Sequence, residues 1–406
     1  MSAPAGPLPI DGAVTIVGTS LAGWRAAQAL RNEGFQGRVV MVGAEPHLPY
    51  DRPPLSKQVL AGKWPPERTA LTTFDQLADL GIELRAGRRA TALDVEARRV
   101  ELDDGSSLQA DAVVLATGAH PRRLPGTDEL ENLVTLRTIE DCLELRRQIA
   151  EAGEGCRVVV VGAGFIGSEV ASTCRDLGCD VLVLEALETP LELALGPRVG
   201  AACAALHREG GVELRTAVAV TGFDAPTKTV LLSDGTSVRA DVVVVGIGVV
   251  PTVDWLDGSG LRIDNGVVCD ASLFAADGVV AAGDVARWPL EDELVRIEHW
   301  QVAADMGLFA ARGLLAGRKA AEPFEPVPYF WSDQYGVKIQ MIGHPRPDDE
   351  VEIVDGSFES RRFVVLYGRN GRLTGALGVG RPAVLMSYRP LLAAHASWDE
   401  ALALRS

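Results

Sequence analysis

Residues 157–185 read RVVVVGAGFIGSEVASTCRDLGCDVLVLE, and the rest of the chain can be organised around this stretch. Its first part, residues 158–162, carries no polar or charged side chain, which predicts a buried parallel strand. The strand runs into the pattern Gly162-x-Gly164-x-x-Gly167, followed by a predicted helix to about residue 177 and a second apolar strand over residues 181–184. Such glycines allow a tight turn, let backbone N–H groups approach a pyrophosphate, and let the helix pack closely on the strand.

An acidic residue, Glu185, ends the second strand 23 residues beyond Gly162. An acid at this position can accept hydrogen bonds from a ribose 2′-hydroxyl. The glycine pattern alone occurs by chance in a glycine-rich chain, but strand, helix and acid together predict a dinucleotide site. A carboxylate would repel a 2′-phosphate, and Ala186, Leu187 and Glu188 offer no arginine to bind one. The sequence therefore predicts NADH rather than NADPH at this site.

The same design occurs 144 residues earlier in the chain. An apolar strand over residues 14–17 leads into Gly18-Thr19-Ser20-Leu21-Ala22-Gly23, a predicted helix over 24–32, a strand over 38–42, and Glu45 just beyond it. Ser20 replaces the middle glycine with a small residue. A βαβ nucleotide fold that occurs twice in one chain is stronger evidence than either copy alone, and two copies predict two dinucleotides, most simply FAD and NAD(P)H.

Four further segments have patterns of interest. Residues 50–57 (YDRPPLSK) contain two prolines that set a rigid bend and hold Arg52 and Lys57 in place, although a surface turn with solvated charges is the alternative. Residues 112–118 and 241–248 predict buried strands that end in glycine, and residues 279–286 predict a strand that closes on Gly283-Asp284. A carboxylate at the end of such a strand can bind the hydroxyl groups of a polyol.

The remaining pattern predicts a third part of the chain. We expect strands over residues 261–270 and a helix over residues 298–315, after which Pro323, Pro326 and Pro328 mark a linker. Beyond the linker come strand-like runs and a C-terminal helix; the runs cover residues 338–343, 350–354, 362–367 and 374–378.

Composition excludes several classes of protein. The chain has 406 residues, enough for two or three domains, and a net charge of −16, which argues against nucleic acid or an anionic membrane as the main partner. The longest uncharged apolar runs are about nine residues, far short of the roughly 20 that span a bilayer. No lysine or arginine precedes Arg25, so a signal peptide is not expected and the cytoplasm is the predicted compartment.

The six cysteines, at positions 142, 156, 174, 179, 203 and 269, show no CxxC pattern and no zinc-ligand spacing. We therefore expect reduced, structural thiols and no metal site. The segment from Tyr50 to Leu60 contains no cysteine. A flavin disulfide reductase or a thiol-dependent peroxidase needs a redox cysteine beside the flavin, so this absence argues against both.

The chain resembles the oxygenase-coupled, FAD-dependent NADH:ferredoxin reductases, the putidaredoxin reductase-like family within the glutathione-reductase-like group. The resemblance covers essentially the full length. It depends on the first glycine-rich loop and on residues 50–57, 116–118 (ATG), 136–138 (LRT), 162–169, 283–284 (GD), 296–298 (RIE) and 331–334 (WSDQ). It implies an α/β fold with two Rossmann-like dinucleotide-binding domains and a C-terminal α/β interface domain. The implied FAD domain combines residues 1–118 and 248–322, the NAD domain is residues 119–247, and the interface domain is residues 323–406.

The resemblance also implies the site residues. FAD would be held by Gly18, Ser20, Leu21, Ala22, Gly23, Glu45, Arg52, Lys57, Ala90, Thr117, Gly118, Arg137, Gly283, Asp284, Trp300 and Trp331. NADH would be held by Gly162, Gly164, Phe165, Ile166, Gly167, Glu169, Glu185 and Gly248. Lys57, Glu169 and Trp331 would take part in catalysis. Glu192 departs from the family, whose members often carry arginine there, which affects the detailed contacts of NADH.

The implied reaction is hydride transfer from the nicotinamide to flavin N5, followed by one-electron steps to a [2Fe–2S] ferredoxin that serves a cytochrome P450 or a ring-hydroxylating dioxygenase. Lys57 would stabilise the negative charge of the reduced flavin, and Glu169 would pair with Lys57. Alternatives remain for single residues: Glu169 as a helix-start carboxylate, Phe165 as a packing residue, and Trp331 as a core aromatic. The alternatives for the whole protein are a simple NADH oxidase and a redox-sensing flavoprotein that resembles apoptosis-inducing factor.

Overall fold

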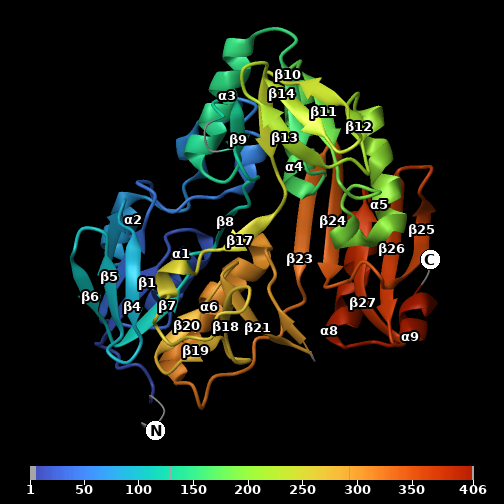
Figure 1. The fold of residues 1–406 in the computed structure, drawn as a ribbon. Coiled ribbons are helices and arrows are strands. Elements are labelled where there is room, and N and C mark those ends of the chain that lie inside the picture. Colours follow the sequence, from blue (N-terminus) through green and yellow to red (C-terminus); the bar gives the residue numbers. More distant parts are fainter. Residues whose placement is uncertain (1–5, 128–129, 292, 405–406) are drawn as a thin grey trace. The chain divides into compact units, whose positions relative to one another are not determined.

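The computed structural model describes residues 6–127, 130–291 and 293–404. Contacts divide the chain into two compact units, whose elements are labelled in Figure 1. The first unit comprises Met1–Asp51, Glu67–His120 and Val250–Pro326, and the second comprises Arg52–Pro66, Pro121–Val249 and Val327–Ser406. The finer division into three domains stays a prediction.

A six-stranded sheet forms the centre of the first unit. In spatial order it consists of β19 (Phe274–Ala276), β20 (Val279–Ala281), β7 (Ala112–Leu115), β1 (Ala13–Val17), β2 (Arg38–Gly43) and β3 (Ile82–Ala86). All neighbours are parallel except β19 and β20. Parallel strands are covered on both faces and need near-continuous apolar sequences. The strands β1 (AVTIV) and β7 (AVVL) meet this requirement, and almost all of their residues are buried.

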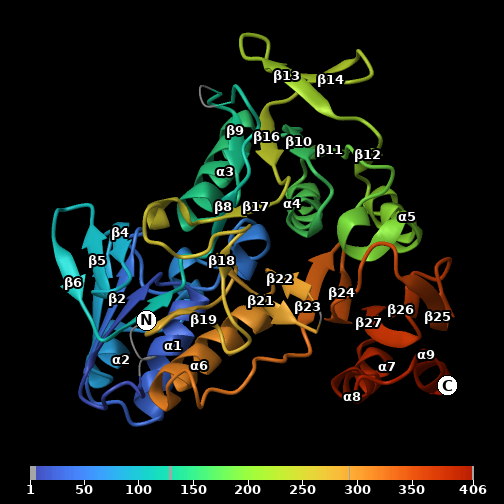
Figure 2. The same cartoon turned by 60° about the horizontal axis from the view of Figure 1, so that its bottom comes forward.

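Two long helices of the first unit, α1 (Leu21–Asn32) and α6 (Trp300–Ala316), lie side by side (Figure 2). Their close approach requires glycine at position 307, because a Cβ atom there would lie 2.2 Å from the carbonyl oxygen of Ala22. Smaller elements of this unit are α2 (Phe74–Asp79), η2 (Pro66–Thr69), η3 (Asp254–Leu256), the sheet β4 (Ala90–Asp94), β5 (Arg99–Leu102), β6 (Ser107–Gln109), and the sheet β18 (Val267–Val268), β21 (Ala286–Leu290), β22 (Glu293–Val295).

A parallel five-stranded sheet forms one part of the second unit. Its spatial order is β12 (Glu213–Arg215), β11 (Asp180–Leu184), β10 (Arg157–Val161), β16 (Val242–Val245) and β9 (Leu133–Thr135). The associated elements are η1 (Pro53–Ser56), α3 (Ile139–Ala152), α4 (Phe165–Asp176), α5 (Glu192–Glu209), and the sheet β13 (Val220–Asp224), β14 (Thr229–Leu232), β15 (Ser237–Arg239). The short strands β8 (Ala119–Pro121) and β17 (Val249–Pro251) pair with each other.

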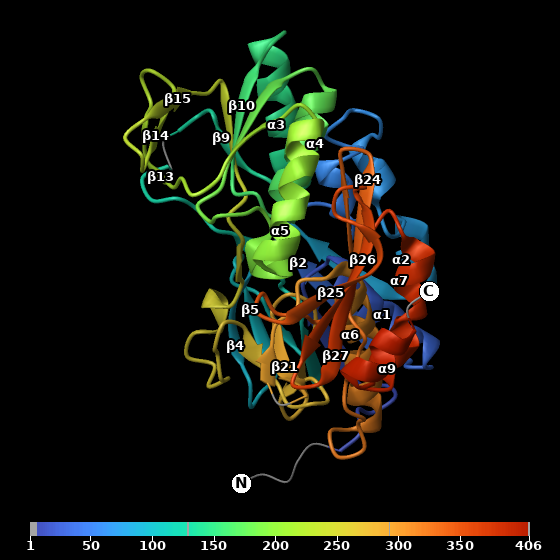
Figure 3. The same ribbon diagram turned by 90° about the vertical axis from the view of Figure 1, so that its right-hand side faces the viewer.

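An antiparallel five-stranded sheet forms the other part of the second unit. Its order is β23 (Tyr329–Gln334), β24 (Val337–Gly343), β27 (Arg372–Val379), β26 (Arg362–Arg369) and β25 (Glu350–Ser357). Helix α5 packs on one face, and the short helices α7 (Pro382–Ser387), α8 (Arg389–Ala393) and α9 (Trp398–Ala403) cover the other (Figure 3). The alternation of strand side chains produces both cores: Phe363 and Val365 face α5, whereas Val364 and Leu366 face the terminal helices.

Most of the predicted elements occur in the structure. Both strand–loop–helix–strand–acid stretches form as predicted, as do the helix predicted over residues 298–315 and the four C-terminal strands. Two predictions were wrong. Residues 261–270 contain only the two-residue strand β18, and the single C-terminal helix is three short helices, because prolines at positions 382 and 390 each begin a new helix. Helix α5 was not predicted, since Gly196 (φ +75°) and Pro197 interrupt its pattern.

No helix among the described residues is long and apolar enough to cross a membrane.

Candidate functional site

The first glycine loop, in the first unit, joins β1 to α1. Gly18 has φ +119°, and a Cβ atom there would lie 2.0 Å from the carbonyl oxygen of Ala116. A Cβ atom at Gly23 would lie 2.0 Å from the carbonyl oxygen of Gly18. These two glycines therefore allow the strand, loop and helix to pack. Ser20 occupies the N-cap of α1 without a side-chain capping bond, so Leu21 and Ala22 form a first turn whose N–H groups suit an anion such as pyrophosphate.

Residues distant in sequence meet this loop. A Cβ atom at Gly283, where φ is +77°, would lie 3.0 Å from the Cβ atom of Ala22 in α1, so the turn after β20 reaches the start of the helix. Asp284 follows in the same turn, and its carbonyl oxygen accepts a bond of 3.1 Å from the guanidinium of Arg296. The structure therefore brings Gly283 and Asp284 to the first glycine loop, as a shared cofactor site requires.

The other predicted FAD residues of the first unit lie at strand and helix ends. The Glu45 carboxylate accepts a short hydrogen bond from the hydroxyl of Tyr50. Thr117 donates its hydroxyl hydrogen to the carbonyl oxygen of Thr252 at 2.8 Å, and Gly118 accepts from the N–H of Thr252 at 3.0 Å. Ala90 is the first residue of β4.

Trp300 begins α6 and donates its indole N–H to Asp51 at 2.8 Å. Burial raises the pKa of Asp51, and the Trp300 hydrogen bond opposes this shift. The Trp300 indole is therefore held by the Asp51 carboxylate, and the main chain of Trp300 lies at the N-terminus of α6.

The second glycine loop, in the second unit, joins β10 to α4. Gly162 has φ +101°, and a Cβ atom there would lie 2.4 Å from the carbonyl oxygen of Gly246, while one at Gly167 would lie 2.1 Å from the carbonyl oxygen of Gly162. Gly164 differs, because its nearest neighbour would be the Gly246 oxygen at 3.9 Å. Gly162 and Gly167 thus serve packing within the protein. The open space at Gly164, the N-cap of α4, fits the close approach of a pyrophosphate.

Glu185 lies directly beside this loop. One carboxylate oxygen accepts the N–H of Ala163 at 2.8 Å, and the other accepts the N–H of Leu187 at 3.0 Å. These bonds hold the acid at the edge of the loop. Gly248, with φ +95°, accepts the N–H of Arg122 at 2.9 Å. Glu192 accepts from the N–H and the hydroxyl of Thr189, both at 3.0 Å, so its carboxylate stabilises the start of α5.

Glu169, in the first half of α4, accepts hydrogen bonds on both of its carboxylate oxygens. One oxygen accepts the Lys57 ammonium at 2.7 Å and the Ser56 hydroxyl at 2.5 Å. The other accepts the Ser332 hydroxyl at 2.7 Å and the Asp333 N–H at 3.3 Å. The side chains of Lys57 and Glu169 are only 14% and 3% exposed. The predicted Lys57–Glu169 ion pair is therefore confirmed, and it joins η1, α4 and β23.

Sequence reasoning missed three of these donors. Ser56 and Ser332 lie within motifs that were recognised, yet the residues selected from those motifs were Arg52, Lys57 and Trp331. The available signal was a serine next to a selected residue: Ser56 precedes Lys57, and Ser332 follows Trp331. Nothing in the local pattern indicated that both hydroxyls bind the same carboxylate, because Ser332 is 163 residues from Glu169.

The aromatic and basic candidates of the second unit also have defined contacts. Phe165, the first residue of α4, packs on Phe330 with ring centroids 4.2 Å apart. The ring of Trp331 stacks on Tyr329 at 6.0 Å. Ile166 is 48% exposed. Arg52 donates a hydrogen bond of 2.5 Å to the carbonyl oxygen of Arg137, so two of the predicted basic residues lie together.

A second polar chain, which the sequence did not indicate, lies behind Glu169. Tyr335 and His207 Nδ1 are 2.8 Å apart, and His207 Nε2 lies 3.3 Å from the Ser168 hydroxyl. His207 is fully buried, and this burial lowers its pKa to about 4, which keeps the imidazole neutral near pH 7. Ser172, one turn beyond Ser168, accepts the N–H of Tyr335 at 2.8 Å. These contacts fix α4 relative to β23 and α5.

Comparison with known families identifies the chain. Residues 12–307 match the family described as pyridine nucleotide-disulphide oxidoreductase. The chain belongs to that family. Residues 329–404 match a second family, described as reductase C-terminal. The predicted fold class is therefore confirmed, and FAD and NADH are the cofactors that this family and its reductase members imply.

Named relatives extend the comparison over nearly the whole chain. Putidaredoxin reductase of Pseudomonas putida is 38% identical over 381 residues, which cover 91% of this chain and 89% of the relative. The ferredoxin reductase component of chlorobenzene dioxygenase from a Cupriavidus species is 38% identical, with 96% and 94% covered. A crystal structure of a covalent putidaredoxin reductase–putidaredoxin complex matches with a TM-score of 0.89 and 35% identity, over 95% of this chain and 93% of that one. The predicted resemblance to this group of oxidoreductases is confirmed.

Proposed function

We propose that this oxidoreductase passes electrons from NADH, through FAD, to a [2Fe–2S] ferredoxin that serves a cytochrome P450 or a ring-hydroxylating oxygenase. The relatives named above are reductases of both kinds of system, and a structural neighbour is a reductase joined covalently to putidaredoxin. The buried ion pair of Lys57 and Glu169 is the observation that carries the proposal, because its lysine lies in the cysteine-free segment where a disulfide reductase would need its redox thiol.

The FAD residues are proposed from the geometry of the first glycine loop and from the resemblance to the reductase family. Gly18, Ser20, Leu21, Ala22 and Gly23 would receive the pyrophosphate through backbone N–H groups. Glu45 would accept from the adenosine ribose, and Asp284 would accept from the ribityl chain. Further contacts would come from Arg52, Ala90, Thr117, Gly118, Arg137, Gly283, Trp300 and Trp331.

The NADH residues are proposed from the second loop. Gly162, Gly164 and Gly167 shape it, and the open space at Gly164 admits the pyrophosphate. Glu185 would accept the adenosine ribose hydroxyls on oxygens that are already oriented by two backbone N–H groups. Phe165, Ile166, Glu169 and Gly248 would complete the site.

When bound, FAD supplies the redox chemistry, since it accepts a hydride and returns electrons singly. The protein supplies orientation and charge. Lys57 contributes a positive charge that favours electron uptake, and Glu169 keeps the ammonium in one orientation through its four donors. Trp331 lies on the strand that also carries Ser332. Its proposed role is to shield the flavin, and it does not react itself.

The first experiment is a spectrum of the purified protein followed by anaerobic titration with NADH. A flavin spectrum that NADH bleaches supports the proposal, and a colourless protein that takes up no FAD contradicts it. Cytochrome c reduction by NADH should then require added [2Fe–2S] ferredoxin. Equal rates without ferredoxin would instead indicate an NADH oxidase. Slow turnover, with a long-lived reduced complex and a change in oligomeric state, would indicate a redox sensor.

A substitution at Glu169 tests whether flavin reduction by NADH depends on its carboxylate. Glu169→Gln removes the charge but keeps an acceptor oxygen, so we expect flavin reduction by NADH to slow by about tenfold, equivalent to roughly 1.4 kcal/mol. Asp176→Asn is the matched control, because Asp176 is exposed at the far end of the same helix. Equal rates for both variants would remove Glu169 from the proposed mechanism.

The cytoplasm is the proposed compartment. All six cysteines lie among the described residues as free thiols, as expected in a reducing compartment. Cell fractionation tests this assignment.

A further inference from the structure

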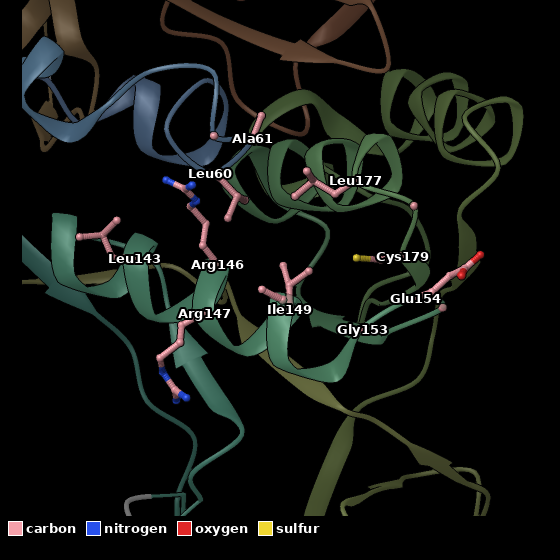
Figure 4. A pocket seen from close by; sticks show the side chains of 14 residues that line it. Leu60, Ala61, Leu143, Arg146, Arg147, Ile149, Gly153, Glu154, Leu177 and Cys179 are labelled. Carbon is pink, nitrogen blue, oxygen red and sulfur yellow. The ribbon is translucent and has the colours of Figure 1, made fainter.

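A cavity of about 820 Å³ lies in the second unit, at the end of α4 remote from the glycine loop. The helix has 12 residues, and at 1.5 Å per residue its two ends are about 18 Å apart. Leu60, Leu143, Ile149 and Leu177 contribute apolar walls, and the thiol of Cys179 lies among them (Figure 4). The cavity is thus separate from the proposed nucleotide site, and nothing in the proposed electron transfer uses it.

Cys179 lies beside two other cysteines. Its N–H donates to the carbonyl oxygen of Cys174, five residues earlier, at 3.1 Å. Cys156 immediately precedes β10, and Cys179 immediately precedes β11. Because Arg157 pairs with Asp180 in the parallel register, Cys156 and Cys179 occupy the next paired position, and the N–H of Asp180 donates to the carbonyl oxygen of Cys156 at 2.9 Å. Cys179 is therefore the shared member of two thiol pairs.

The three thiols differ in acidity and access. Hydrogen bonds from the Cys174 and Cys156 thiols lower the pKa of Cys179, whereas the pKa values of Cys174 and Cys156 are raised. Cys179 lines the cavity, but Cys174 and Cys156 are not among the lining residues. A lower pKa increases the thiolate fraction, which is the nucleophilic form. Cys179 is only 2% exposed, as is Cys156, so what distinguishes it is its place in the cavity wall, where a small reagent can meet it.

We propose that Cys179 is a peroxide-oxidisable thiol that forms a disulfide with Cys174 or Cys156. The Cys179 thiolate attacks one oxygen of hydrogen peroxide, the O–O bond breaks, and the departing hydroxide takes up a proton to leave as water. The resulting sulfenic acid is then attacked at sulfur by the neighbouring thiol, the S–O bond breaks, and a second water leaves. Two thiols lose two electrons and two protons, and one peroxide becomes two waters.

Geometry permits both disulfides. Residues at paired positions of neighbouring strands are about 4.8 Å apart, which lies inside the range of roughly 4.4–6.8 Å between the Cα atoms of disulfide partners. Cys174 and Cys179 are held together by the bond of 3.1 Å from the N–H of Cys179 to the carbonyl oxygen of Cys174, across the turn that follows α4. Either bond would tie the end of α4 or the start of β10 to the start of β11.

Thiol counting and peptide mapping on the FAD-loaded protein test the proposal. A short pulse of hydrogen peroxide should reduce the count from six free thiols to four. Trypsin separates the three cysteines, because cleavage after Arg147, Arg157, Arg175 and Arg198 places Cys156, Cys174 and Cys179 on different peptides. The peptide containing Cys179 should appear joined to one of the other two.

Substitutions sharpen the result. Cys179→Ser should abolish the linked peptides, whereas Cys203→Ser, at a thiol that is equally buried but does not line the cavity, should leave them unchanged. The double variant Cys156→Ser/Cys174→Ser removes both partners and should stop disulfide formation at Cys179, which checks the result if Cys179→Ser is poorly folded. Six thiols remaining in the unmodified protein, or linked peptides that lack Cys179, would overturn the proposal.

Discussion

Removal of the Glu169 carboxylate tests how the site is held together. Glu169→Ala would leave the Lys57 ammonium, two serine hydroxyls and the Asp333 N–H without their shared acceptor, in a place where the lysine side chain is only 14% exposed. Breaking a buried ion pair by removing one partner costs roughly 3–5 kcal/mol, because a charge stays buried without compensation. At roughly 2–4 °C per kcal/mol for a unit of this size, the unfolding midpoint should fall by about 6–20 °C.

A double-mutant cycle separates the buried charge from the lost packing. Lys57→Met keeps the length of the side chain and removes the ammonium, so Glu169→Ala/Lys57→Met leaves no buried charge. We expect the double variant to regain about half of the stability that Glu169→Ala loses, with a coupling energy above roughly 1 kcal/mol. The measurement is denaturant unfolding of the FAD-loaded protein, followed by circular dichroism. If Glu169→Ala and the double variant unfold at the same denaturant concentration, the uncompensated ammonium is not the source of the loss.

Three other predictions follow from the same structure. Glu185→Ala/Glu188→Arg should shift the ratio of kcat/KM values toward NADPH by at least about tenfold, or roughly 1.4 kcal/mol; an unchanged ratio would show that Glu185 does not select the coenzyme. Gly162→Ala should destabilise the protein by about 1–3 kcal/mol because Gly162 has a positive φ. Gly164→Ala, where φ is −73°, should leave stability unchanged and raise the KM for NADH. The reverse pattern in thermal unfolding and kinetics would refute these roles. Folding depresses the pKa of His207 from 6.5 to about 4. The neutral imidazole therefore contributes about 3 kcal/mol of stability that is present above pH 6.5 and lost as the pH falls toward 4. Unfolding free energies measured from pH 7 to pH 4 should show a shallower pH dependence for His207→Gln than for the unmodified protein, and equal slopes would contradict this.

Local sequence was sufficient for the two nucleotide motifs. A buried parallel strand needs an uninterrupted apolar run, and a strand-to-helix turn without room for Cβ atoms needs glycine, so both requirements are visible within about 30 residues. The positive φ values of Gly18 and Gly162 and the backbone oxygens next to them agree with that reading. The duplication and the acids after β2 and β11 were likewise predictable, because each depends on neighbours in sequence.

Helix α5 was not predictable from the local sequence pattern. Gly196 has non-helical backbone angles (φ +75°, ψ 164°), so α5 consists of two helical segments joined at a kink. Leu195 before the kink and Val199 after it both belong to the core that α5 forms with the C-terminal sheet. Gly196 is itself required there, since a Cβ atom would lie 2.5 Å from the carbonyl oxygen of Pro347. The local signal for termination is therefore obeyed at Gly196, and tertiary packing decides that a helix resumes directly after it.

By itself, the sequence determined the cofactor class, because the conformation of a phosphate-binding loop is specified by the small residues within it. Only the tertiary structure decided which groups surround Glu169, since Ser56 and Ser332 lie 113 and 163 residues away along the chain. The same holds for His207 between Ser168 and Tyr335, and for Cys156 beside Cys179. A hydrogen bond depends on distance in space, and the spacing of residues along a chain does not contain that distance until strands and helices have packed.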